Sequence, residues 1–148
     1  MEYTIEKVTE ENFEEWLKMG LALWPDNEEE ELRDEFTDII NSEKEESFLI
    51  SIDNKYIGFI NMSLRTDYVE GSDSSPVGYV EGIYVDPDYR EKGIARILIE
   101  KCEEWTRSRG CSQIASDCEL DNAISYKFHR SVGFKEANRI ISFIKDLD

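Results

Sequence analysis

The feature that most constrains the fold of this chain is an apolar strand followed at once by a glycine turn and an amphipathic helix. Residues 77–85 have the apolar, β-branched composition of a strand, and residues 86–95 form a turn that contains Gly93. Apolar side chains then recur at helical spacing, at Ile94, Ile97, Leu98, Cys102 and Trp105. A strand and a helix joined in this way bury their apolar sides against each other, which predicts an α/β or α+β protein.

The rest of the chain continues this mixture of strands and helices. Strands are predicted at residues 3–8, 48–52, 56–65, 114–118, 134–137 and 139–145, and further helices before Pro25, from Glu28 to Ile40 and at 122–132. The predicted order is βααβββαβαββ, which corresponds to a single mixed β-sheet with helices on both faces. No linker or repeat divides the sequence, so residues 1–148 are expected to form one domain.

The charge of the chain limits its partners. It has 34 acidic and 17 basic residues, a formal net charge of −17. Nucleic acids and anionic membranes bind to basic surfaces, so we expect neither as a partner. The acidic excess favours a cationic small-molecule amine, although acidic runs can also serve only as a solvated surface.

The sequence contains no pattern of a signal peptide, a membrane span or a metal site. Charged residues begin at Glu2, and no run approaches the roughly 20 apolar residues of a membrane-spanning helix. The three cysteines, Cys102, Cys111 and Cys118, include no Cys-x-x-Cys pair, and the chain has a single histidine. We therefore expect a cytoplasmic protein without a metal.

The turn after the 77–85 strand is the first candidate binding site. Arg90-x-x-Gly93-x-Ala95 opens the following helix. Small residues at 93 and 95 let backbone N–H groups approach an anion, and the helix dipole favours negative charge there, so the turn fits a pyrophosphate. The same spacing also fits an ordinary β-α turn that needs glycine for its φ angle, and it is neither a Gly-x-Gly-x-x-Gly motif nor a P-loop.

Two motifs resemble the GNAT superfamily of N-acetyltransferases. They are Ile83-Tyr84-Val85-x-Pro87-x-Tyr89-Arg90-x-x-Gly93-Ile94-Ala95 and Asn122-x-x-Ser125-x-x-x-His129-x-x-x-Gly133-Phe134. The usual superfamily form of the second has Ala at the place of Ser125 and Tyr at the place of His129. The resemblance implies that acetyl-CoA is the acetyl donor. It also implies a donor site made by Ile83, Tyr84, Val85, Arg90, Glu91, Lys92, Gly93, Ile94, Ala95, Arg96 and Asn122.

A narrower resemblance, to the aminoglycoside 6'-N-acetyltransferases, is carried by several separate stretches. They are Leu23-Trp24-Pro25, Arg65-x-Asp67-Tyr68-Val69-x-Gly71-x-Asp73-Ser74-Ser75-Pro76, Glu81-Gly82-Ile83, Gly110-Cys111, Ala115-Ser116-Asp117 and Gly133-Phe134. This resemblance implies an aminoglycoside site that contains Trp24, Tyr68, Glu81 and Asp117. Related enzymes carry a further acid shortly after the Gly-Phe pair. Here Glu136 is close to that place and Asn138 occupies the matching position, so both are candidates for substrate binding.

Three residues are candidates for the chemistry of acetyl transfer. An ammonium group must lose a proton before it attacks a thioester, either to a base or through a water path. The strand pleat puts Glu81 on the same face as Val85 and opposite to Val80. An acid among apolar strand residues would not be buried without a reason; the alternative is an acid that is exposed or paired with a local arginine.

Asp117 lies near the end of the next strand. Parallel neighbouring strands would bring Glu81 and Asp117 to one crevice, where Asp117 is the favoured base and Glu81 a second anchor. Backbone N–H groups of residues 83–85 are suited to stabilise the thioester oxygen. His129 stands where the superfamily often has a tyrosine that protonates the thiolate, and it either takes that role or serves as a structural helix residue.

Three functions are compatible with these patterns. The first is acetylation of an aminoglycoside, the second is acetylation of another polyamine or of a peptide amine, and the third is a non-catalytic acyl-CoA-binding module. No Ser-His-Asp or Cys-His pairing is evident in the sequence, so direct transfer is expected. Proteins that resemble this chain are commonly dimers, and a homodimer is expected to use the apolar residues of the last predicted strand, Ile140, Ile141, Phe143 and Ile144.

Overall fold

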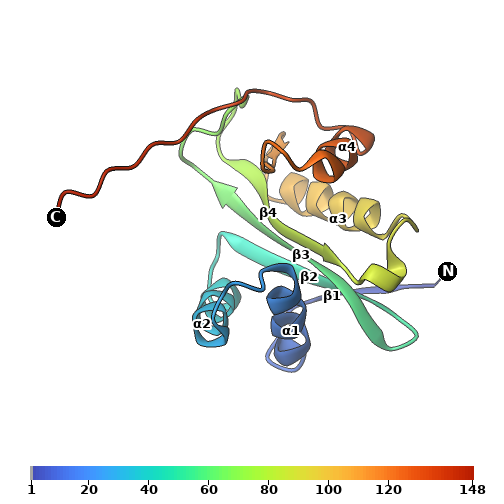
Figure 1. Ribbon diagram of the computed structural model, residues 1–148. Helices are drawn as coiled ribbons and strands as arrows, with labels where there is room; N and C mark the ends of the chain where they lie inside the picture. The colour runs from blue at the N-terminus through green and yellow to red at the C-terminus, as the bar shows by residue number, and fades with distance from the viewer. Residues whose placement is uncertain (1) are drawn as a thin grey trace.

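The computed structural model describes residues 2–148 and shows a five-stranded mixed sheet with helices on both faces (Figure 1). Along the chain the elements are β1 Thr4–Lys7, α1 Phe13–Leu23, α2 Glu29–Ile40, β2 Glu45–Ile52, β3 Lys55–Arg65, β4 Val77–Val85, the 3-10 turn η1 Pro87–Tyr89, α3 Ile94–Ser108, β5 Ile114–Ala115 and α4 Ala123–Ser131. The strands lie in the order β1-β2-β3-β4-β5; β1 to β4 are antiparallel and β5 is parallel to β4. The predicted class, a mixed sheet with helices on both faces, is confirmed.

Each face of the sheet has its own core. Helices α1 and α2 cover one face, where Trp16 stacks on Phe36 with ring centroids 4.0 Å apart and packs with Leu49 and Phe59. Helix α3 covers the other face, where its apolar stripe packs on a second set of strand residues, among them Ile50, Ile60 and Val85. Neighbouring residues of β2 and β3 therefore alternate between the two cores, as a sheet buried on both faces requires.

β4 contains an irregularity that the sequence alternation does not predict. Its pairing with β3 passes from Val80 directly to Gly82, which leaves Glu81 as the extra residue of a β-bulge. Val80 and Val85 consequently share the core beneath α3. The expectation that they face opposite sides of the sheet is wrong, because the bulge shifts the alternation by one residue.

The two strands predicted after α4 are not formed within the described part of the chain. Residues 134–148 adopt neither helix nor strand, and the last of them run away from the body of the protein (Figure 1). A strand requires a hydrogen-bonded neighbour, and none of these residues pairs with the sheet. The apolar residues of this tail are exposed, from 67% at Ile140 to 96% at Ile144. The predicted element order is therefore wrong in its last two strands.

A buried polar cluster joins α1 to the strands next to the bulge. Asn61, which pairs with Gly82 across the β3–β4 ladder, accepts hydrogen bonds at Oδ1 from Trp16 Nε1 at 3.0 Å and from Ser47 Oγ at 2.6 Å. All three side chains are nearly inaccessible to solvent. This one amide oxygen thus satisfies two buried donors from two different elements.

We predict that Asn61→Ala destabilises the protein by about 2–3 kcal/mol, because it leaves the Trp16 and Ser47 donors buried without an acceptor. Urea denaturation measures the loss. Asn41→Ala is the matched control, since Asn41 donates to the Thr37 carbonyl at the exposed end of α2. An equal loss of unfolding free energy in the two variants would show that the buried cluster contributes no more to stability than an exposed hydrogen bond.

Candidate active site

The turn between β4 and α3 exposes the N-terminus of a helix. Gly93 is the N-cap of α3 with a φ of 80°, and Glu91 has a φ of 61°, so the chain makes two left-handed steps before the helix begins. Among residues 2–148, no backbone carbonyl accepts a hydrogen bond from the N–H groups of residues 91–96. These free donors stand at the positive end of the α3 dipole, an arrangement that suits a pyrophosphate.

The basic side chains of this turn have partners within the protein. Arg90 donates from Nε to the Val85 carbonyl at 3.0 Å, which ties the turn back to the end of β4. The Lys92 ammonium lies 5.5 Å from the centroid of the Tyr89 ring. Arg96 donates to the Ser131 carbonyl at 2.8 Å and so links α3 to the end of α4. Arg90 and Arg96 therefore hold the turn and α4 in place, in addition to any contact with a donor.

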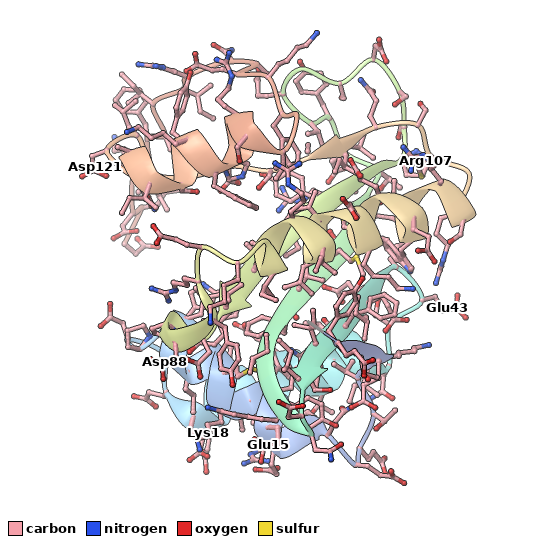
Figure 2. The ribbon with its side chains drawn as sticks, turned by 90° about the vertical axis from the view of Figure 1, so that its right-hand side faces the viewer. Glu15, Lys18, Glu43, Asp88, Arg107 and Asp121 are labelled. Carbon is pink, nitrogen blue, oxygen red and sulfur yellow. The ribbon has the colours of Figure 1, made fainter. Side chains whose placement is uncertain are left out.

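Asn122 lies at the start of α4. Its side-chain oxygen accepts from the Ser125 N–H at 3.0 Å, so it is the N-cap of that helix. Figure 2 shows Asp88, in the turn before α3, and Asp121, before α4, on the same side of the molecule. The N-termini of both helices thus open toward that side, with the amide nitrogen of Asn122 left for another partner.

Glu81 forms an ion pair at the bulge. Its two carboxylate oxygens accept from Arg65 Nε at 2.9 Å and Arg65 Nη2 at 2.7 Å, and Ser63 Oγ donates to it at 2.5 Å. One third of the Glu81 side chain is exposed. The acid is therefore not buried among the apolar strand residues; of the alternatives that the sequence left open, the exposed, arginine-paired acid is the one observed. The same ion pair raises the pKa of Arg65 above its usual value.

Asp117 lies just beyond β5, on an exposed segment. It accepts a hydrogen bond from the Tyr79 hydroxyl of β4. The Tyr79 ring is 7% exposed, and the Arg65 guanidinium carbon lies 3.4 Å from its centroid. The two predicted carboxylates thus lie in β4 and just after its parallel neighbour β5, and Arg65 and Tyr79 link them.

His129 uses both of its ring nitrogens. Nδ1 lies 2.7 Å from the Ser125 carbonyl, which can only accept, so Nδ1 carries a proton. In the neutral ring Nε2 is then an acceptor, and it takes a hydrogen bond from Ser116 Oγ at 2.8 Å. A serine hydroxyl and an imidazole are therefore paired beside Asp117, a pairing that the sequence did not reveal.

Two aromatic residues predicted for the acceptor site have different surroundings. Trp24, at the C-terminal end of α1, is half buried and lies on Gly82, where an added Cβ would stand 2.5 Å from the indole ring. Glycine at 82 therefore lets Trp24 pack directly on β4 beside Glu81. Tyr68 is 74% exposed in the loop before β4, where a ring is free to stack on a ligand.

The chain after α4 passes against that loop. Asn138 Nδ2 donates to Glu70 Oε2 at 3.1 Å, and Glu136 pairs with Arg139. The backbone of Gly71 approaches Ala137 so closely that an added Cβ would lie 2.5 Å from the alanine methyl. Asn138 therefore contacts the 66–76 loop that also carries Tyr68, and Glu136 lies one residue before the contact of Ala137 with Gly71.

No site role was predicted from the sequence for Arg65, Tyr79 or Ser116, which contact the predicted acids and histidine, although Arg65 and Ser116 lie in the stretches that carry the narrower resemblance. Ser116 precedes Asp117 directly, and Tyr79 lies two residues before Glu81. Arg65 ends β3, opposite the start of β4, so its reach to Glu81 depends on the β3–β4 register. Polar residues beside a candidate acid can be recognised in the sequence, but the β3–β4 register cannot be determined from it.

Two features are absent from residues 2–148, a membrane-spanning helix and a cluster of metal ligands. No helix there is long and apolar enough to cross a membrane. No group of three or more His, Cys, Asp or Glu side chains is arranged to hold a metal ion in the same residues.

Comparison with known proteins identifies the family. Residues 6–134 match the acetyltransferase (GNAT) family. The chain belongs to this family. As a GNAT enzyme it is an acetyl-CoA-dependent N-acetyltransferase, and the open turn at Gly93 lies in the first motif by which the sequence resembled that family.

Individual relatives are similar over nearly the whole chain. The aminoglycoside N(6')-acetyltransferase type 1 of Acinetobacter haemolyticus is 37% identical over 144 residues, which is 97% of this chain and 99% of the relative. The enzyme of the same name from Salmonella enteritidis is 36% identical over 141 residues, 95% of this chain and 97% of the relative.

Solved structures agree with this similarity. The structure of AAC(6')-Iy in complex with the bisubstrate analog CoA-S-monomethyl-acetylneamine superposes with a TM-score of 0.95 at 35% identity and covers 99% of both chains. The apo structure of AAC(6')-IG from Acinetobacter haemolyticus gives a TM-score of 0.93 at 35% identity, covering 98% of this chain and 99% of the other.

We predict that Gly93→Ala raises KM for acetyl-CoA about tenfold or more, because a side chain at a φ of 80° strains the turn that presents the free N–H donors. Gly110→Ala is a matched control: Gly110 also has a φ of 80° and open space around it, but it follows the opposite end of α3. Both variants should lose about 1–2 kcal/mol of stability from the left-handed backbone. Steady-state kinetics with varied acetyl-CoA decide the point, and an equal KM in both variants contradicts the donor-site assignment.

Proposed function

We propose that this protein transfers the acetyl group of acetyl-CoA directly to the 6'-amino group of aminoglycoside antibiotics, and that it thereby confers resistance to them. The observation that carries this proposal is similarity over nearly the full chain to enzymes named aminoglycoside N(6')-acetyltransferase, including the TM-score of 0.95 to a complex with an acetylneamine bisubstrate analog. A relative similar only in its donor-binding half would not support a particular acceptor.

The charge of the protein supports a polycationic acceptor. The protein has a net charge of −17, which attracts cations and so raises the rate at which a cationic substrate meets the protein. At the site itself, the Glu81 charge is already matched by Arg65, whereas Asp117 has no basic partner among residues 2–148. We therefore assign Asp117 to the reacting ammonium group and Glu81, with Trp24, Tyr68, Glu136 and Asn138, to the binding of the rest of the acceptor.

In the proposed reaction Asp117 takes a proton from the acceptor ammonium, directly or through one water, and the neutral amine attacks the thioester carbonyl carbon. The carbonyl oxygen becomes negative in the tetrahedral intermediate and requires hydrogen-bond donors. Among the described residues, β5 pairs with β4 only at Gly78 and Tyr79, so the edge of β4 opposite β3 has no neighbouring strand beyond the bulge. This free edge supports the backbone of residues 83–85 as the source of those donors.

Collapse of the intermediate breaks the carbon–sulfur bond and releases the CoA thiolate, which requires a proton. We assign its supply to His129 through Ser116. From the doubly protonated ring, the Nε2 proton passes to Ser116 Oγ while the serine proton passes to the thiolate sulfur, which leaves a neutral ring, an intact serine hydroxyl and the CoA thiol. The 2.8 Å contact between Nε2 and Ser116 Oγ supports this route.

Further parts of the proposal concern organisation. Residues 1–148 act as a single N-acetyltransferase domain in the cytoplasm, where acetyl-CoA is supplied. The protein is a homodimer in which the apolar tail after Arg139 is covered by the partner chain. Support comes from the exposure of Ile141, Phe143 and Ile144, at 81%, 90% and 96%, since such an apolar segment is costly to leave in water.

The expected activity is release of CoA thiol when acetyl-CoA and kanamycin are mixed with the protein. Neomycin and paromomycin form a matched pair, because they differ only in a 6'-amine or a 6'-hydroxyl. We predict turnover of neomycin and loss of at least about a hundredfold in kcat/KM with paromomycin, since the reacting amine is missing. Turnover of spermidine without turnover of any aminoglycoside would replace the aminoglycoside assignment by that of another polyamine.

The same assay tests the assignment of the acids. Asp117→Asn should lower kcat/KM for kanamycin about a hundredfold or more, as expected for loss of a general base. Glu81→Gln should cost less, because its charge is already compensated by Arg65. Wild-type rates in the Glu81→Gln/Asp117→Asn double variant would remove both residues from the site.

We predict that the wild-type protein sediments at twice the chain mass and that Phe143→Glu/Ile144→Glu sediments as a monomer, because two charges are too costly to bury in an apolar interface. Lys145→Glu is the control, with a change of charge on the same tail and no loss of apolar surface. A monomeric wild-type protein in sedimentation equilibrium would contradict the homodimer.

A further inference from the structure

Asp117 has little structural support of its own. It follows a strand of only two residues and lies in a segment, residues 117–122, that is exposed throughout. Among the described residues, its side chain has one hydrogen-bond partner, the hydroxyl of Tyr79. A carboxylate on such a segment would rotate freely if that bond were absent, and a freely rotating group is a poor partner for a reacting amine.

Tyr79, in contrast, is fixed on several sides. It lies in β4 beside Ala115 of β5 and packs with Val69 and Val77 in a small core. The Arg65 guanidinium covers its ring at 3.4 Å. The sheet and the packed ring therefore fix the position of the hydroxyl oxygen. A hydrogen bond from this hydroxyl restricts the orientation of the Asp117 carboxylate.

The charges around Tyr79 are separated in a specific way. Arg65 lies against the ring, and both of its donated hydrogen bonds to a side chain go to Glu81. Asp117 receives only the neutral hydroxyl, which occupies Oδ2 and leaves Oδ1 without a partner within the described chain. Burial, followed by the hydrogen bond to Asp117, keeps the pKa of the Tyr79 hydroxyl far above its usual value, so this group remains a donor throughout the working range of pH.

We propose that Tyr79 is a positioning residue of the acceptor site: its hydroxyl holds the Asp117 carboxylate in place, with Oδ1 free for the acceptor ammonium, and its ring keeps Arg65 on Glu81. This inference rests on the proposed function, in which Asp117 meets the reacting amine. It adds a residue that neither the sequence motifs nor the charge pattern of the chain singled out.

Tyr79→Phe keeps the ring and removes only the hydroxyl. We expect kcat/KM for kanamycin to fall about tenfold, a value typical of one lost hydrogen bond to a charged group, while KM for acetyl-CoA stays unchanged. Tyr56→Phe is the matched control. The Tyr56 hydroxyl also donates to a carboxylate, that of Glu6, but on the β3 and β1 strands away from Asp117. Wild-type kinetics of Tyr79→Phe, or the same loss in Tyr56→Phe, would overturn the inference.

A double-variant comparison separates positioning from a general structural effect. If Tyr79 acts through Asp117, Tyr79→Phe should change kcat/KM by less than about twofold when Asp117→Ala is already present, because the carboxylate to be positioned is gone. A purely structural contribution would reduce activity by the same factor in both backgrounds, and that result would overturn the inference.

The unliganded protein gives a readout that does not depend on the acceptor. In urea denaturation, Tyr79→Phe should lower the midpoint clearly in the wild-type background and not in Asp117→Ala. Equal shifts in both backgrounds would show that the two side chains are not coupled, and so overturn the inference whatever the activity. Absence of aminoglycoside turnover by the wild-type protein, with the coupling intact, would overturn the proposed function instead.

Discussion

The arrangement of the candidate active site depends above all on the point at which β4 and β5 stop pairing. β4 pairs with β3 along nearly its whole length, but it pairs with β5 at only two positions. The pairing with β3 anchors β4 between the two apolar cores. The pairing with β5 is so short that the other edge of β4 stays open. The bulge at Glu81 lies on this open edge, and the turn before Gly93 follows the end of β4. Tyr79 is the last residue of β4 that pairs with β5. A longer pairing of β5 with β4 would cover the open edge of β4, where the proposed reaction takes place.

The proposed donor and acceptor sites consist of different kinds of atom, and this explains how far the sequence could be interpreted. The donor turn is made of backbone N–H groups whose exposure depends on Gly93, and a glycine at a fixed distance after an apolar strand is visible in sequence. Helical stripes and alternating strands were likewise predictable, because one-dimensional spacing determines which side of each element is buried. The fold class, the two helical layers and the GNAT assignment all follow from such local patterns.

The remaining features depend on spacing between strands. The bulge adds one residue to β4 in its pairing with β3. Val80 and Val85 are five positions apart, which in a regular strand places them on opposite faces, but because of the bulge they share one face. Arg65 reaches Glu81 because of that same register, and Tyr79 reaches Asp117 because β5 is parallel to β4. In the tail, the apolar pattern that predicted two strands occurs in residues that do not pair with any edge of the sheet. Local pattern reports the preference of a segment, but not whether a neighbour exists to pair with it.

The contact between Gly71 and Ala137 has a consequence for how this enzyme could diversify. The tail segment that touches the 66–76 loop is continuous with the apolar stretch that is free of the body of the protein. The loop that carries Tyr68 therefore contacts a segment whose far end does not pack on the body of its own chain. In the proposed homodimer, a change in the tail that alters the interface would also move the support of the loop that carries Tyr68. Acceptor range and quaternary structure would then change together.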